Sequence, residues 1–261
     1  MEFAAREFLA EQARQNIVYT EVTYTINQRK MPFKPQLEAL NRAKTWAQKE
    51  FGISMNYVID IPRNFENMDP SAFSTLFATH AVQGMGQGVV ALGLAGKEDT
   101  HNVADFSAGF DIAKEAGLPI VPHAGEAVGP QSMLDAIEHC APPRIGHGVR
   151  CVEDKNLMAL LKERQIHLEI SPTSNICLGI FDSMADHSFA EIAAAGIPFS
   201  INSDDPPYFN TTLTDELIIV AERLNWTVED VQAHMVKTAE ATLLPENEKS
   251  ALINKIKNPH L

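Results

Sequence analysis

Cysteine is scarce in this sequence of 261 residues, and the three that occur, Cys140, Cys151 and Cys177, include no Cys-x-x-Cys pair. This usage argues against a disulfide framework or a thiolate zinc finger and favours a reducing compartment. No apolar run reaches the roughly 18 residues that a membrane span needs. The N-terminal MEFAAREFLAEQARQ is amphipathic and acidic, unlike a signal peptide. We therefore expect a cytoplasmic protein with no membrane partner.

Basic residues are also few, with 21 lysines and arginines against 34 aspartates and glutamates and a formal net charge of −13. A surface of that sign repels phosphate backbones, so we expect no nucleic-acid polymer as a partner. A small neutral or cationic substrate is compatible with it. Nothing in the composition indicates an oligomeric state.

Short apolar runs rich in β-branched residues predict seven strands. They cover residues 16–24, 55–61, 88–94, 118–124, 143–148, 166–171 and 197–203. Helical patterns lie between them, and one begins with Asp69 as N-cap and Pro70 at the first helical position. Three glycines, Gly52, Gly117 and Gly196, are each predicted to close a helix just before the next strand.

The alternation of strands and helices predicts βαβ units and a parallel sheet, and the nearly continuous apolar strands indicate that both faces are covered. A doubly wound sheet is one such fold, but no glycine-rich phosphate loop follows the first strand. Polar residues instead follow the C-terminal ends of strands, where (β/α)8 barrels carry their chemistry. We predict an α/β fold in one domain over residues 1–261, a TIM-type (β/α)8 barrel truncated at its N-terminus to about seven strands, with helices beyond Asp205.

Two of the nine histidines, His123 and His147, end predicted strands beside glycines. Gly125, Gly146 and Gly148 leave room for a ligand or metal to approach the backbone there. The histidines in or beside predicted helices are interpreted as surface or core residues: His80, His139, His187 and His234.

Two adjacent carboxylates, Asp204 and Asp205, follow the last predicted strand in SINSDDPPYF. Their repulsion does not favour folding, so the pair is either an ordinary polar turn or a site in which one carboxylate holds a cation and the other meets a substrate. Imidazole nitrogen and carboxylate oxygen suit Zn²⁺, which lowers the pKa of a bound water to about 7. With His123 and Asp204 on the metal, His147 as base and Glu126 as acid, the residues predict a metal-assisted hydrolase.

Four motifs in chain order resemble the adenosine deaminase family of the amidohydrolase superfamily. They are HAGE at 123–126, RIGHG at 144–148, SPTSN at 171–175 and NSDDP at 202–206, and GLAGKE at 93–98 agrees with them. The resemblance extends from about residue 3 to residue 245. It implies one zinc per chain and the hydrolytic deamination of a small purine nucleoside, adenosine plus water giving inosine plus ammonia.

The resemblance also implies roles for individual residues. His123 and Asp204 would be zinc ligands, with Asp204 also orienting the attacking oxygen. Glu126 would give a proton to the purine N1. His147 would assist deprotonation of the attacking water.

Other positions bear on the substrate. By the same resemblance, Asp205 would hydrogen-bond the purine and the backbone N–H of Gly96 would meet its ring. Adenine deaminases of the family tend to have aspartate where Gly146 stands, which makes free adenine a weaker alternative to adenosine. Adenosine deaminases often have an acid at position 93, where this sequence has glycine. VPHAGEAVGP and INSDDPPYF resemble the branch that includes aminodeoxyfutalosine deaminases of menaquinone synthesis, a further alternative.

One feature of the family is missing. Its members carry a His-x-His pair on the first strand that supplies two more zinc ligands, and no His-x-His occurs in these 261 residues. We expect either that Met1 is an internal start in a longer gene or that the chain is a relative that has lost this strand. A catalytically inactive purine-binding or subunit-contact protein is therefore an alternative of another class, and it would not require a tightly held zinc. An amidohydrolase acting on a cyclic amide is a third alternative.

Overall fold

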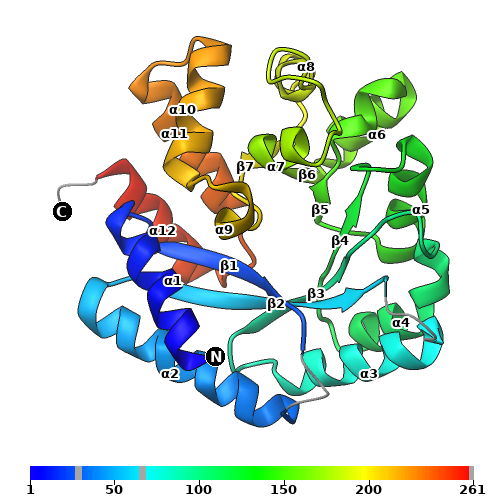
Figure 1. The fold of residues 1–261 in the computed structure, drawn as a ribbon, viewed down its shortest axis with the longest axis vertical. Coiled ribbons are helices and arrows are strands. Elements are labelled where there is room, and N and C mark those ends of the chain that lie inside the picture. Colours follow the sequence, from blue (N-terminus) through cyan, green and yellow to red (C-terminus); the bar gives the residue numbers. More distant parts are fainter. Residues whose placement is uncertain (27–30, 65–68, 259–261) are drawn as a thin grey trace. The chain divides into compact units, whose positions relative to one another are not determined.

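The computed structural model describes residues 1–26, 31–64 and 69–258 (Figure 1). It divides into two compact units. The first unit comprises Met1–Ala95 and Asp105–Ile120, and the second comprises Gly96–Ala104 and Val121–Leu261. Strands alternate with helices in both, as the sequence predicts.

The first unit contains three parallel strands with their helices. Its elements are α1 (Glu2–Arg14), β1 (Tyr19–Tyr24), α2 (Phe33–Phe51), β2 (Ser54–Pro62), α3 (Pro70–Gln83), β3 (Val89–Ala95) and α4 (Ser107–Glu115), the last preceded by the 3₁₀ helix η1 (Val103–Phe106). Residues 57–62 of β2 are all buried, so both faces of this strand are covered. Full burial of aliphatic side chains such as Ile59 and Leu92 contributes about 1.5–3 kcal/mol each.

The predicted helix boundaries of this unit follow from local capping. Asp69 accepts a hydrogen bond from the Ser71 N–H, and Pro70 occupies the first turn of α3. Helix α2 ends at Gly52, whose φ of 72° is a left-handed conformation that glycine adopts without strain. These predictions are confirmed.

The second unit contains four parallel strands. Its elements are β4 (Ile120–Ala124), α5 (Pro130–Cys140), β5 (Arg144–His147), η2 (Val149–Glu153), α6 (Lys155–Arg164), β6 (His167–Ile170), α7 (Pro172–Cys177), α8 (Phe189–Ala195), β7 (Phe199–Ile201), α9 (Pro206–Phe209), α10 (Leu213–Leu224), α11 (Val228–Glu240) and α12 (Glu246–Lys257). The pairs β4–β5, β5–β6 and β6–β7 are parallel. Their C-terminal ends therefore lie at one edge of the sheet, where the loops that carry the predicted polar residues begin.

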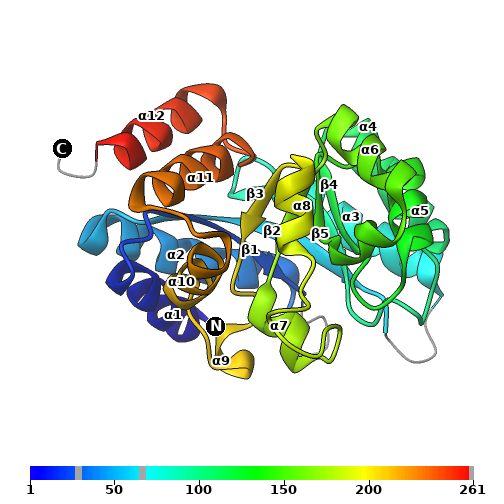
Figure 2. The same cartoon turned by 90° about the horizontal axis from the view of Figure 1, so that it is seen from above.

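Helices beyond Asp205 are present as predicted. Both α10 and α11 begin with a capping box, in which a threonine and the acid three residues later bond to each other's backbone. Helix α12, which the sequence interpretation did not identify, packs beside α11 (Figure 2), with the Gln232 side chain donating to the Ile256 carbonyl at 2.8 Å.

All seven predicted strands are present, each parallel to its neighbours within its unit. The predicted α/β fold of the truncated (β/α)8 type is thus confirmed. Among the described residues, no helix combines the length and apolar character needed to cross a membrane.

Candidate active site

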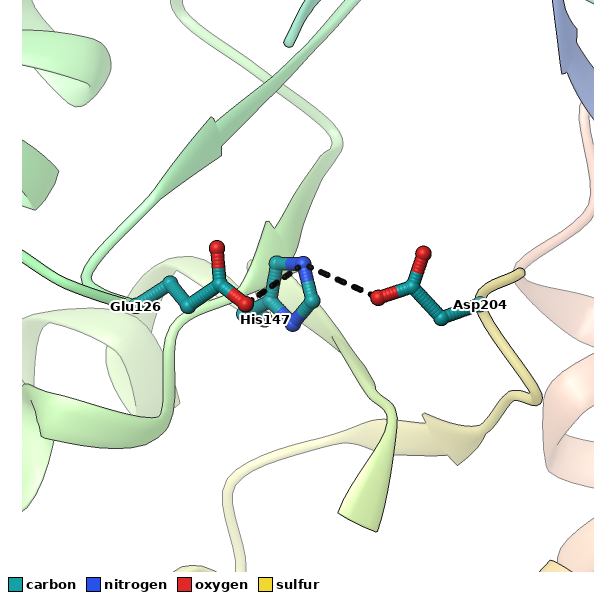
Figure 3. A group of neighbouring side chains, drawn as sticks. All are labelled: Glu126, His147 and Asp204. Atoms are coloured by element: carbon teal, nitrogen blue, oxygen red, sulfur yellow. Dashed lines mark ion pairs between the residues drawn. The ribbon is translucent and has the colours of Figure 1, made fainter. Parts of the chain in front are cut away.

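Three polar side chains meet at the C-terminal edge of the second unit's sheet (Figure 3). Glu126 follows β4, His147 ends β5 and Asp204 follows β7. Their ligand atoms all lie within 4.8 Å of one another. Nε2 of His147 is 3.5 Å from Oε1 of Glu126 and 3.9 Å from Oδ2 of Asp204, so both carboxylates face the same ring nitrogen.

His123 lies beside this group because of the register of β4 and β5. The strand pairing places His123 opposite Gly146 and Ala124 opposite His147, and the two imidazole centroids are 5.2 Å apart. A Cβ atom on Gly146 would stand 3.0 Å from Cγ of His123, closer than ordinary contact. Because glycine has no side chain, position 146 leaves room for the His123 ring.

The two residues predicted to bind substrate are not members of the three-residue group. Asp205 follows Asp204 directly and starts α9, and burial raises its pKa, with the charge of Asp204 acting in the same direction. Gly96 is the first residue after β3 and has a φ of 90°, a conformation that favours glycine.

Two members of the group have an uncommon backbone conformation. His147 has a φ of 61° and Asp204 a φ of 53°, both in the left-handed region. Such conformations in residues with side chains cost on the order of 1–3 kcal/mol each and cluster at functional sites. Here they occur where the two side chains converge.

The electrostatics of the group favour proton transfer. Burial raises the pKa of Glu126 to about 7, with the charges of Asp204 and Glu98 adding to the effect and that of His123 opposing it. Burial also lowers the pKa of His147, which keeps its ring neutral. A carboxyl group with a pKa near neutrality can hold and release a proton at physiological pH.

The SPTSN segment, which starts α7, supports the group from one side. Ser174 Oγ donates to Oδ2 of Asp204 at 2.6 Å. Nδ2 of the fully buried Asn175 donates to Oε1 of Glu126 at 3.4 Å and lies 3.3 Å from Nδ1 of His147. The motif itself is visible in the sequence, but the roles of Ser174 and Asn175 are not; the position of the motif directly after β6 is the available signal.

Asn175 in turn contacts a residue that we interpreted as belonging to the surface or core. His187 is buried, and its Nε2 lies 3.2 Å from Oδ1 of Asn175. No local pattern indicates this link to the site, because the two positions are twelve apart along the chain.

A buried carboxylate holds the loop that carries Glu126. Glu98 accepts hydrogen bonds from the backbone N–H groups of residues 125, 126, 127 and 128 at 2.6, 3.1, 2.8 and 2.8 Å. It also accepts one from the Ser132 hydroxyl. A carboxylate only accepts hydrogen bonds, which matches a loop that presents only donors. Glu98 lies in the GLAGKE motif, but the sequence alone did not predict its role.

We expect Glu98→Gln to destabilise the protein by about 2–4 kcal/mol, because the glutamine N–H₂ would face backbone donors and leave some of them unsatisfied. Urea unfolding measures this loss. Amide hydrogen exchange should show faster exchange at residues 125–128. Asp99→Asn, the same chemical change at an exposed neighbour, is the control and should leave both unchanged. Unaltered exchange at 125–128 in Glu98→Gln would contradict the proposal that Glu98 holds this loop.

Comparisons with known proteins identify the family of this chain. A family model described as "Adenosine deaminase" matches residues 2–259. The chain is 33% identical over 255 residues to an adenine deaminase of Sinorhizobium fredii, covering 95% of this chain and 76% of the relative. It is 36% identical over 221 residues to an aminodeoxyfutalosine deaminase of Streptomyces coelicolor, covering 84% of this chain and 57% of the relative.

Solved structures share the fold. The crystal structure of an adenine deaminase from Arthrobacter aurescens has a TM-score of 0.89 at 23% identity, covering 98% of this chain and 78% of that one. An amidohydrolase from Burkhoderia ambifaria, with bound Zn, has a TM-score of 0.89 at 19% identity, covering 99% and 72%. At these identities the likeness establishes the architecture alone.

Proposed function

Because the chain belongs to the adenosine deaminase family, we propose that it is a zinc-dependent enzyme that removes the 6-amino group of a purine nucleoside, with adenosine giving inosine and ammonia. The relatives are deaminases, which supports hydrolysis of a purine amine. The observation that carries the proposal is the convergence of Glu126, His147 and Asp204 on one point.

The donors in the site fit zinc. Imidazole nitrogen and carboxylate oxygen are usual zinc ligands, and Ser174 orients the Asp204 carboxylate by donating to one of its oxygens. We propose that His123 and Asp204 hold the metal, while the His-x-His pair that the family adds does not occur in this sequence. Zinc, when bound, would lower the pKa of a water molecule to about 7.

The remaining residues would act on the purine. Water would add its oxygen to C6 while Glu126, with its pKa near 7, gives its proton to N1 and the proton released by the water passes to the amino group. The C6–N bond then breaks and ammonia leaves, and the hydroxyl proton on C6 returns to Glu126, which leaves a C6 carbonyl. Asp205 and the backbone N–H of Gly96 would hold the ring by hydrogen bonds.

The packing at position 146 favours a nucleoside over the free base. Aspartate at this position is what the resemblance associates with adenine deaminases, and any side chain here would meet the His123 ring at 3.0 Å. The relatives named adenine deaminase make adenine the second candidate, and the Streptomyces coelicolor relative makes aminodeoxyfutalosine the third.

Ammonia release tests the function directly. The purified chain, with and without added zinc, is incubated with adenosine, adenine or aminodeoxyfutalosine. We expect zinc-dependent ammonia with adenosine as the best substrate. Faster ammonia release from adenine would make the free base the substrate instead of the nucleoside. Adenosine binding without ammonia release would favour the non-catalytic alternative.

We expect Asp204→Ala to lose zinc and turnover together. Removing a direct ligand should weaken metal binding by more than the roughly 10- to 100-fold that loss of an outer partner causes. Metal analysis per chain and ammonia release measure the two effects. The adjacent Asp205→Ala is the matched control and should keep its zinc while KM rises. A zinc-replete, active Asp204→Ala would contradict the ligand assignment.

A further inference from the structure

A buried chain of hydrogen bonds leads from the start of α8 to the candidate active site. The backbone N–H of Phe189 donates to Nδ1 of His187 at 3.1 Å. Nε2 of His187 lies 3.2 Å from Oδ1 of Asn175, and Nδ2 of Asn175 lies 3.3 Å from Nδ1 of His147. All four residues are buried, so the side-chain groups have each other as partners in place of bulk water.

The backbone N–H of Phe189 can only donate, and this fixes the direction of its bond to His187 and of the bond between His187 and Asn175. Because the Phe189 amide gives its proton to His187 Nδ1, that nitrogen must present a lone pair. Burial lowers the pKa of His187 to about 4, so the ring is neutral and its single proton is on Nε2. This proton needs an acceptor, which requires the oxygen of Asn175 to face His187.

The orientation of Asn175 then decides the next bond. With its oxygen turned to His187, the amide nitrogen faces the site and has two protons to donate. Two acceptors lie within reach, Oε1 of Glu126 at 3.4 Å and Nδ1 of His147 at 3.3 Å. Nδ1 of His147 therefore accepts, and the proton of the neutral ring is on Nε2. That nitrogen is the one that faces Glu126 and Asp204 in Figure 3.

We propose that His187 is a positioning residue that, through Asn175, holds His147 as the Nε2–H tautomer and directs that N–H at the space between Glu126 and Asp204. In the reaction proposed above, on which this consequence rests, neutral His147 holds the attacking oxygen by donating a hydrogen bond to it. This differs from the base role that the family resemblance implies for His147, since a protonated Nε2 has no lone pair to offer. The tautomer itself does not depend on the substrate or the metal.

Nitrogen-15 NMR of histidine-labelled protein tests the proposal without turnover. Couplings from the ring carbon-bound protons distinguish a protonated from an unprotonated nitrogen in each histidine. We expect Nε2–H in both His147 and His187 of the metal-free chain. An Nδ1–H tautomer of His147 would overturn the proposal.

Three variants test whether His187 acts on His147 through Asn175. Asn175→Asp replaces the amide donor by an acceptor, so His147 should switch to the Nδ1–H tautomer while His187 keeps its own. His187→Leu removes the donor and should leave His147 as a mixture of tautomers, whereas His187→Gln, whose amide can still donate to Asn175, should restore one tautomer. An unchanged His147 tautomer in Asn175→Asp and in folded His187→Leu would overturn the proposal.

Kinetics separate a positioning role from a structural one. In an active preparation, His187→Leu should lower kcat about 10-fold with little change in KM, and His187→Gln should recover most of it. His167→Leu replaces another buried histidine of this unit and is the control for lost stability; its His147 tautomer and kcat should not change. The predicted tautomers in a chain without deaminase activity would support the positioning and overturn the proposed function.

Discussion

Glu126→Gln is expected to lower kcat by about 10²- to 10⁴-fold, the range that a positioned general acid contributes. Glutamine has nearly the same shape and keeps an oxygen that can accept the Asn175 bond, but it has no proton to give to a purine nitrogen. Zinc content should stay unchanged, because His123 and Asp204 are the proposed ligands. Steady-state ammonia release and metal analysis on the same preparation measure both quantities.

A second readout of this variant requires no activity. The pKa of Glu126 rises from 4.5 to about 7 on folding, so the native state binds more protons than the unfolded state between these values. Stability therefore falls as pH rises through this window. Glutamine does not ionise, so Glu126→Gln avoids this decrease in stability. The variant should raise the unfolding free energy at pH 8 by up to about 3 kcal/mol.

The control is Glu138→Gln, the same change on the exposed side of α5. It should leave kcat and stability unchanged. Full activity of Glu126→Gln would remove Glu126 from the mechanism. Metal loss in this variant would instead make Glu126 a ligand, as its place in the three-residue group allows.

Acidification from pH 6.5 to pH 5 is expected to destabilise the protein steeply. Besides that of His147, burial lowers the pKa of three further histidines, with His167 at about 3 and both His187 and His234 at about 4. The unfolded chain protonates these positions below about pH 6.5, whereas the native state keeps them neutral. These three sites take up three protons on unfolding, which corresponds to about 4 kcal/mol lost per pH unit near pH 5. Glu126, which is protonated in the native state at this pH, acts in the opposite direction and offsets part of that loss.

The sign and size of this effect are open to direct measurement. The unfolding free energy from urea titrations at pH 7, 6 and 5 should fall along that slope. His234→Gln should reduce the slope by about 1.4 kcal/mol per pH unit, since it removes the proton taken up at one site. His139→Gln, at a half-exposed position, serves as the control and should leave it unchanged. A pH-independent unfolding free energy between 7 and 5 would contradict the buried neutral state of the three rings.

Local patterns were sufficient for most of the architecture. Strand runs such as residues 55–61 and the caps at Asp69 and Gly52 depend on neighbours within a few positions, and the structure confirms them. The convergence of Glu126 and Asp204 on His147 also followed from the sequence, because parallel strands bring their C-terminal ends to one edge.

The supporting residues depend on contacts that no local pattern contains. Glu98 meets the loop at 125–128 from 27 to 30 positions away, and Asn175 meets Glu126 from 49 positions away. No local pattern relates residues this far apart, so the sequence shows these residue types but not their partners.

The left-handed backbone of His147 and the hydrogen-bond direction set through His187 likewise required the folded structure. Local sequence specifies which groups can donate and which can accept. Only the packed chain decides which of them meet, because in a buried site each donor must find its acceptor among the neighbours that the fold supplies.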